Sequence, residues 1–419
     1  MKLLIECLLA FAFYYPLFMA WLWMQGAGHY YLHYERKDPP LEQPPELPYP
    51  PLSVIVPCYN EEAHVRETIG YALALDYPDF EVIAVNDGSQ DATGEILDRM
   101  AAEQPRLRVI HQEPNQGKAV GLNTALLLAR HEFLLCIDGD AVLDPYAGKW
   151  LMRHFLTSPR VGAVTGNPRI RNRSSLLGRL QVGEFTAIIG LIKRAQRTYG
   201  RLFTVSGVLT AFRKTAVFQA GFWSEDMLTE DIDISWKIQL RHWSVRFEPR
   251  ALVWILMPET LRGLWKQRLR WAKGGTQALW RNAWVLGQWR HRHMVPIYLE
   301  YFLSVIWSYS MAFVIVYWLL HLVLPAQTVP VASPFIPSWY GLVLGFTCMT
   351  QFAVSKWIDS SYDRGLGRNY YWMIWYPLAF WLINVATTIV AFPQALVRKK
   401  GKRARWTSPD RGVHHVNQA

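Results

Sequence analysis

The apolar residues of this 419-residue chain are gathered into long runs rather than spread evenly. Four runs are almost free of charge, and each is about as long as the roughly 20 residues that a membrane-spanning helix needs: Leu3–Met24, Tyr298–Leu324, Ser338–Ile358 and Tyr370–Phe392. The first run is too aromatic for a signal peptide, and no small-residue cleavage site follows it. The pattern therefore predicts membrane-spanning segments both before and after a soluble domain in the sequence.

These runs divide the chain into segments. A stiff, proline-rich linker follows the first run, and strand and helix patterns then alternate up to about Met257. The predicted segments are an N-terminal transmembrane anchor at 1–28, the linker at 38–51, a cytoplasmic catalytic domain at 52–257, amphipathic interface helices at 258–297, transmembrane helices at 298–393 and a basic tail at 394–419.

The formal net charge of +11 could indicate a nucleic-acid partner, but the cations lie beside the apolar runs. They cluster at Arg36-Lys37, Arg290–His293 and Arg398–Arg403, which favours anionic lipid headgroups and the positive-inside rule. A simple fourth span would nevertheless place the tail on the far side of the membrane. Either Tyr370–Phe392 is re-entrant or broken near Pro377, or the tail is an exception to that rule. The four cysteines form no CxxC pair, so neither a zinc site nor a disulfide framework is expected.

The central segment has the alternating pattern of an α/β domain with a mostly parallel, Rossmann-like sheet. The expected strands are Ser53–Pro57, Glu81–Asn86, Arg108–His111 and Phe133–Ile137, and the expected helices are Glu61–Leu75 with Asn60 as its N-cap, Thr93–Ala102, Lys118–Arg130 and Ile234–Arg241. Ligands of such sheets bind outside the carboxyl ends of the strands. We therefore expect the site at that edge.

Acidic residues follow two of these strands directly. Asp87 follows the second strand, and Asp138 and Asp140 flank a glycine after the fourth strand. Paired carboxylates of this kind can hold Mg²⁺ or Mn²⁺, which in turn binds a diphosphate. A lone Asp-Gly-Asp is more often a turn, but a second acid at a neighbouring strand end favours a nucleotide site.

A third acidic motif, Thr229-Glu230-Asp231, precedes the last of these helices. A carboxylate near a helix N-terminus is favoured as the anion, so Asp231 is a candidate general base that removes a proton from an attacking hydroxyl. The alternatives are a helix-capping role for Asp231 and a second metal-binding pair made of Asp231 and Asp233.

Gln267, Arg270 and Trp271 lie at helical spacing in a segment where tryptophans and cations alternate. Such a helix suits the headgroup layer of a membrane. Arginine can bind phosphate oxygens through two N–H groups, and tryptophan offers a flat face for a sugar ring.

The series Asp87, Asp138-Gly-Asp140, Thr229-Glu-Asp231 and Gln267-x-x-Arg270-Trp271 resembles the processive family-two glycosyltransferases, which include cellulose, chitin and hyaluronan synthases. The resemblance covers nearly the whole chain and implies a GT-A-type domain inserted between transmembrane helices. It implies Asp231 as the base, Asp140 as the metal ligand, and substrate contacts from Tyr59, Glu61, Asp87, Lys118, Asp138, Ser206, Gly207, Glu230, Gln267, Arg270 and Trp271.

The resemblance is greatest to the bacterial members that polymerise N-acetylglucosamine through β-1,6 linkages for biofilm. It implies an inverting enzyme that takes UDP-N-acetylglucosamine, elongates a glycan and couples synthesis to export. It also implies a small membrane partner subunit, a multi-pass location in the bacterial inner membrane, and no nucleic-acid partner. Another processive synthase, a single-transfer lipid glycosyltransferase and a catalytically silent membrane scaffold remain as alternatives.

Overall fold

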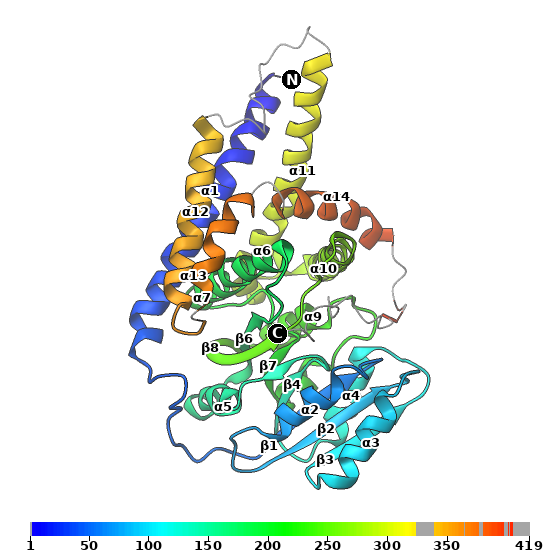
Figure 1. The fold of residues 1–419 in the computed structure, drawn as a ribbon. Helices are drawn as coiled ribbons and strands as arrows, with labels where there is room; N and C mark the ends of the chain where they lie inside the picture. Colours follow the sequence, from blue (N-terminus) through cyan, green and yellow to red (C-terminus); the bar gives the residue numbers. More distant parts are fainter. Residues whose placement is uncertain are drawn as a thin grey trace. The chain divides into compact units, whose positions relative to one another are not determined.

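Figure 1 shows the computed structural model, which describes residues 2–323, 339–363, 365–376, 380–397, 401, 403 and 404. The chain divides into two compact units. We call Tyr34–Gly178, Gly200–Gly263 and Arg398–Ala419 the sheet unit, and Met1–His33, Arg179–Tyr199 and Leu264–Val397 the helical unit. Within the range 52–257 that we predict as the catalytic domain, residues 179–199 thus belong to the helical unit.

The strands described in the sheet unit form one mixed sheet in the order β3-β2-β1-β4-β7-β6-β8-β5. The bounds are Leu52–Cys58 for β1, Phe80–Asp87 for β2, Leu107–Gln112 for β3, Phe133–Ile137 for β4, Val142–Leu143 for β5, Val161–Ile170 for β6, Leu209–Arg213 for β7 and Ser244–Ile255 for β8. Parallel pairing joins β1 to β2 and β4, β2 to β3, and β6 to β8. Because only β7 and β5 pair antiparallel with their neighbours, the mostly parallel α/β sheet is confirmed.

Short helices connect these strands and pack against the sheet (Figure 1). They are α2 (Val65–Leu73), α3 (Thr93–Glu103), α4 (Lys118–Leu128), α5 (Ala147–Thr157), α8 (Lys214–Ala220) and α9 (Glu230–Leu240), and the short helix η1 (Glu35–Lys37) precedes β1. The core between α4, α9 and the sheet contains fully buried aliphatic side chains such as Ile55, Leu126 and Ile238. This packing gives the strand ends a rigid base.

Two predicted helix starts are wrong. The second helix begins at Val65 rather than Glu61, and His64 precedes it as the N-cap residue. Asn60 instead adopts a left-handed conformation with φ of 53°, which asparagine tolerates because its short side chain can bond to nearby backbone; its Oδ1 accepts the Gln90 N–H at 2.9 Å. The helix expected at Ile234 begins at Glu230, which brings Asp231 into its first turn.

The proline-rich linker is fastened to the sheet unit rather than extended away from it. Asp38 accepts hydrogen bonds from Arg153 at 2.6 Å and from Arg250 at 3.2 Å, and the Trp150 indole donates to the Leu41 carbonyl at 2.8 Å. Arg153 also contacts the fully buried carboxylate of Glu248 at 2.9 Å. One buried network therefore joins the linker, α5 and β8.

Glu248 is the centre of this network, and its removal should destabilise the fold. Burial disfavours its charge, but hydrogen bonds from His154 and the charge of Arg153 prevail and lower the pKa to about 2. Its stabilising effect is therefore complete above the unfolded-state pKa of about 4.3 and is lost as the pH falls towards 2. At pH 7, Glu248→Gln should lower the free energy of unfolding by about 3 kcal/mol, because Arg153 loses one of its two carboxylate partners and the charge at the centre of a buried network disappears.

Thermal unfolding at neutral pH measures this effect, with Glu103→Gln as the control because Glu103 is exposed at the end of α3. A melting temperature for Glu248→Gln equal to that of the control would contradict the prediction.

The helical unit contains the longest helices. The long ones are α1 (Lys2–His33), α11 (Val295–Val323), α12 (Trp339–Asp359) and α14 (Leu382–Val397), and the same unit contains the shorter helices α7 (Leu191–Tyr199), η3 (Ala283–Gly287), η4 (Trp289–Met294), α13 (Leu366–Asn369) and η5 (Tyr370–Trp375). Two further helices, α6 (Leu176–Glu184) and α10 (Leu261–Arg281), begin in the sheet unit and continue into the helical unit, and a π-helical turn at Phe185–Gly190 links α6 to α7.

Two helices of the described residues are long and apolar enough to cross a membrane, namely Lys2–Lys37 and Trp289–Leu320. The fourth apolar run is not one continuous helix: η5 ends at Trp375 and α14 begins at Leu382, while Pro377 lies outside the described residues. In Figure 1, α14 runs crosswise to α1, α11 and α12. At 16 residues it is about 24 Å long, less than the thickness of about 30 Å of a hydrocarbon core. This favours the broken or re-entrant alternative for the fourth apolar run.

Candidate active site

The predicted acids lie at one edge of the sheet. Strand β1 lies between β2 and β4 and runs parallel to both. Asp87 is the last residue of β2, and Asp138 follows β4 directly. The loop after β1 carries Tyr59 and Glu61 to the same edge. Gly139 packs so closely on β1 that a Cβ there would lie 2.9 Å from the Pro57 carbonyl oxygen, so this position needs glycine.

Asp87 is fully buried and organises a loop. Its two carboxylate oxygens accept the backbone N–H groups of Gln116 and Gly117, each at 2.8 Å. The preceding turn is also tight, because Gly88 has φ of 67° and a Cβ there would lie 2.6 Å from the Asn115 nitrogen. In this structure Asp87 therefore fixes the loop that leads into α4, and direct contact with a base stays a prediction.

Lys118, the first residue of α4, joins three of the predicted motifs. Its Nζ lies 2.5 Å from Asp138 Oδ1 and 3.0 Å from Glu230 Oε1, and it donates to the Gly207 carbonyl at 3.4 Å. Burial alone would lower the pKa of this ammonium, but Asp138 and then Glu230 outweigh burial and raise it. Lys118 is therefore a permanent cation among the acids.

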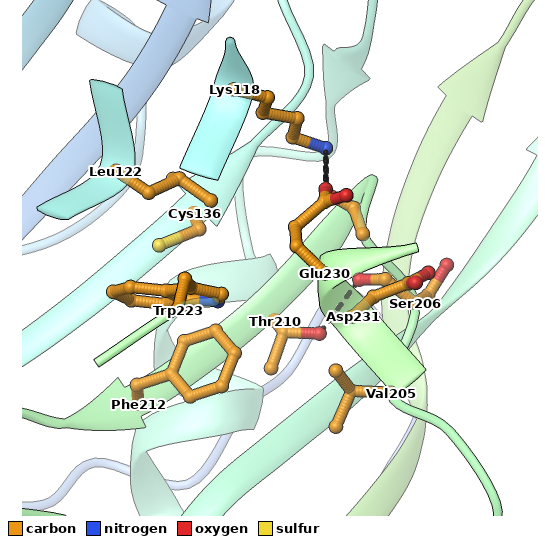
Figure 2. Close-up of a pocket in the computed structure, with 11 residues that line it drawn as sticks. Lys118, Leu122, Cys136, Val205, Ser206, Thr210, Phe212, Trp223, Glu230 and Asp231 are labelled. Carbon is orange, nitrogen blue, oxygen red and sulfur yellow. Dashed lines mark hydrogen bonds and ion pairs between the residues drawn. The ribbon is translucent and has the colours of Figure 1, made fainter. Parts of the chain in front are cut away.

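Figure 2 shows Lys118 pointing towards Glu230, with Asp231 and Ser206 on the far side of the hollow and Trp223 and Phe212 along its wall. A Cβ on Gly207 would lie 3.4 Å from Asp231 Oδ2, so the glycine leaves room beside that carboxylate. The hollow itself has a volume of about 10 Å³, which is about the space of one water molecule. Lys118 and the surrounding acids thus fill the space between the motifs.

Asp231 lies in the first turn of α9. Its Oδ1 accepts the Ile232 N–H at 2.9 Å, and the positive end of the helix favours its anionic form. Asp233 differs, because only 1 % of it is exposed and its carboxylate lies 3.7 Å from Lys237. Residues two apart on a helix do not face each other, so the alternative metal pair of Asp231 and Asp233 is not supported.

Several polar residues that support the site were not predicted. Thr93 Oγ1 accepts the Glu61 N–H at 2.7 Å, and Ser89 Oγ accepts the Asn60 N–H at 3.0 Å. Thr165 Oγ1 accepts the Ser206 N–H at 2.7 Å. Glu61 itself is only 1 % exposed, so it helps to close this loop. These contacts join residues that lie far apart in the sequence, so no local pattern or spacing could predict them.

The last predicted motif belongs to the helical unit, whereas the acids belong to the sheet unit. On α10, Gln267 and Trp271 are half-buried and Arg270 is exposed. Gln267 and Trp271 are four residues apart and therefore share a face of the helix. The exposed guanidinium of Arg270 is accessible to an anionic ligand.

Residues 50–274 match the model of a family described as "Glycosyltransferase like family 2". Over 408 residues, the chain is 39% identical to a poly-β-1,6-N-acetyl-D-glucosamine synthase of Staphylococcus epidermidis, covering 96% of this chain and 98% of the relative. The chain belongs to glycosyltransferase family 2. A synthase of the same name from Staphylococcus aureus (strain COL) is 38% identical over 405 residues, with the same coverage.

A solved structure supports the fold of this family 2 glycosyltransferase. It is a mannosyltransferase from Pyrobaculum calidifontis in complex with GDP-Man and Mn²⁺, with a TM-score of 0.66 and 20% sequence identity, and the match covers 94% of this chain and 99% of that one. The GT-A-type fold is thereby confirmed. The matched family segment 50–274 also contains every site residue that we predicted, from Tyr59 to Trp271.

The acids of this family 2 glycosyltransferase fit a divalent cation. Burial raises the pKa of Asp138, the Lys118 charge lowers it, and the neighbouring Asp140 raises it again, with a net upward shift. Asp140 is therefore near enough to repel Asp138, and the two carboxylates offer the hard oxygen donors that Mg²⁺ and Mn²⁺ prefer. The described residues contain no group of three or more protein ligands.

Proposed function

We propose that the chain polymerises N-acetylglucosamine from UDP-N-acetylglucosamine into a β-1,6-linked exopolysaccharide. The names of the Staphylococcus relatives support the sugar and the linkage, at 38–39% identity over nearly the whole chain. The observation that carries the chemistry is the joining of Asp138, Glu230 and Gly207 through Lys118 beside Asp231. These groups bring together a site for a diphosphate and a site for a base.

The transfer follows from this arrangement. Asp231 takes the proton of the acceptor hydroxyl, and the hydroxyl oxygen forms a bond to the anomeric carbon of the donor. The bond from that carbon to the diphosphate oxygen breaks, and UDP leaves with its electron pair. Attack opposite the leaving group converts an α-linked donor into a β-linked product.

Charge on the departing UDP is offset by cations of the chain. Lys118 lies among the acids of the site, and Arg270 offers an exposed guanidinium for phosphate oxygens. A divalent ion held by Asp140 and Asp138 would supply further charge neutralisation at the diphosphate. Tyr59, Glu61 and Asp87 shape the pocket for uridine, and Ser206, Gly207, Gln267 and Trp271 hold the acceptor.

The helical unit anchors this chemistry in a bilayer. Lys2–Lys37 and Trp289–Leu320 provide two apolar helices of sufficient length, and a location in the bacterial inner membrane is part of this proposal. We propose a multi-pass protein whose catalytic domain faces the cytoplasm, whose membrane helices export the glycan, and which works with a small membrane partner subunit.

The sugar and the product are tested together. Membranes that contain the enzyme are incubated with radiolabelled UDP-sugars, one at a time, and the product is digested with linkage-specific hydrolases. We expect incorporation from UDP-N-acetylglucosamine into long chains that a β-1,6-specific hydrolase degrades. Incorporation from UDP-glucose alone would overturn the sugar assignment. A labelled lipid carrying one sugar would instead identify a single-transfer lipid glycosyltransferase.

A further inference from the structure

In the helical unit, Trp271 lies beside a buried ion pair. Glu184 is the last residue of α6, and its carboxylate contacts the Nη2 of Arg268 on α10. Their side chains are only 3% and 8% exposed. Arg268 occupies one of the two variable positions of the Gln267-x-x-Arg270-Trp271 motif, where the motif itself requires no particular residue.

Arg268 stacks on the indole of Trp271. Its guanidinium carbon lies 4.5 Å from the centre of the Trp271 ring, which is within the range of a cation–π contact. The Phe185 ring approaches the same indole with a centroid separation of 6.5 Å and a tilt of 55°. Phe380 lies 5.8 Å from the guanidinium on another side. The indole is therefore packed by a cation and an aromatic ring.

The local backbone supports this arrangement. Glu184 is followed by the π-helical segment Phe185–Gly190; π-helical turns are rare and are frequently found at functional sites. At the junction of α6 and this segment, two successive residues contact α10: Glu184 pairs with Arg268, and Phe185 approaches Trp271.

A contribution to stability does not by itself explain why Glu184 and Arg268 form a buried ion pair. Two charges lose their hydration when they are buried, and an apolar pair of similar volume often stabilises a protein equally well. An ion pair does, however, hold a planar guanidinium in one orientation. A buried ion pair at this position is therefore explained if the orientation of the Trp271 indole is important for function.

We propose that Arg268 and Glu184 are positioning residues for the acceptor glycan: Glu184 fixes Arg268, and Arg268 fixes the plane of Trp271, on which the terminal sugar stacks. This proposal rests on the proposed function, in which Trp271 binds the acceptor. A sugar ring packs its C–H face on an aromatic ring, so a tilted indole would lose acceptor affinity while the donor site is unchanged.

The test uses the purified full-length enzyme in lipid nanodiscs, with β-1,6-linked N-acetylglucosamine oligosaccharides as acceptors. Arg268→Lys keeps the charge but loses the planar stack, and Glu184→Gln removes the charge that fixes Arg268. We expect each variant to raise the KM for the acceptor about tenfold, the loss expected for one such contact, with the KM for the donor unchanged. Lys266→Gln is the control, because Lys266 is an exposed cation on the same helix.

A double variant, Glu184→Leu with Arg268→Leu, guards against misfolding, since an apolar pair can replace the ion pair without loss of stability. It should keep the melting temperature of the wild type and still show the raised acceptor KM. Trp271→Ala separates the positioning role of Arg268 and Glu184 from the assignment of Trp271 to acceptor binding. If Trp271→Ala impairs acceptor use but the Arg268 and Glu184 variants do not, the positioning proposal is wrong. If Trp271→Ala leaves the acceptor KM unchanged, the assignment of Trp271 itself is wrong.

Discussion

Asp231→Asn is expected to lower the rate of transfer by about 10²- to 10⁴-fold, the range that a general base contributes. Asparagine has nearly the shape of aspartate, so it keeps the hydrogen bond that Asp231 Oδ1 accepts from the Ile232 N–H. It cannot, however, take a proton from the acceptor hydroxyl. The affinity for UDP should stay within about twofold, because Lys118, Asp138 and Glu230 remain joined.

The measurement combines UDP release during turnover with the dissociation constant of UDP from calorimetry. Asp98→Asn is a matched control, since it makes the same chemical change at an exposed side chain on α3. Polymer of normal length and yield from the Asp231 variant would refute the base assignment. A parallel loss of UDP affinity would instead indicate that Asp231 supports the nucleotide site.

Asp140→Asn is expected to be the second most damaging substitution. It removes one of the two charges that would hold a divalent cation, and such an ion contributes several kcal/mol to stabilising charge in the transition state. We expect at least about a 10²-fold loss of turnover, where each tenfold corresponds to about 1.4 kcal/mol. Removal of divalent ions with a chelator should cause a similar loss in the wild type.

Calorimetric titration of UDP with and without Mn²⁺ separates this role from simple damage to the fold. In the wild type, Mn²⁺ should strengthen UDP binding, and in Asp140→Asn most of that gain should disappear while metal-free binding is kept. An Mn²⁺ effect of wild-type size in the variant would rule out Asp140 as the metal ligand.

The sequence predicted the elements of this fold well where local patterns determine them. Short buried strands such as Ser53–Pro57 have a clear apolar pattern, and an acid after a strand lies at the sheet edge whatever the rest of the chain does. Helix starts were less accurate, because Asn60 resembles an N-cap in sequence but lies in a left-handed turn that also binds the loop at Gln90.

Contacts between residues that are far apart in the sequence could not be predicted from local patterns. Lys118 contacts the Gly207 carbonyl, 89 positions away along the chain, and only the folded sheet brings the two together. Glu184 lies in an apolar stretch and matches no motif, so its partner Arg268 could not be inferred from spacing. The prolines predict a stiff linker, but they do not indicate contacts such as that of Asp38 with Arg153, which hold the linker against the sheet unit.

The ammonium of Lys118 has a consequence for the catalytic cycle. Asp138 and Glu230 come from separate segments, and as like charges they would repel each other each time the nucleotide departs. Because one covalently attached cation remains between them, the segments need not separate and reassemble between additions. A polymerising enzyme exchanges its nucleotide once for every sugar added, so we expect this tether to keep the dead time between successive additions short.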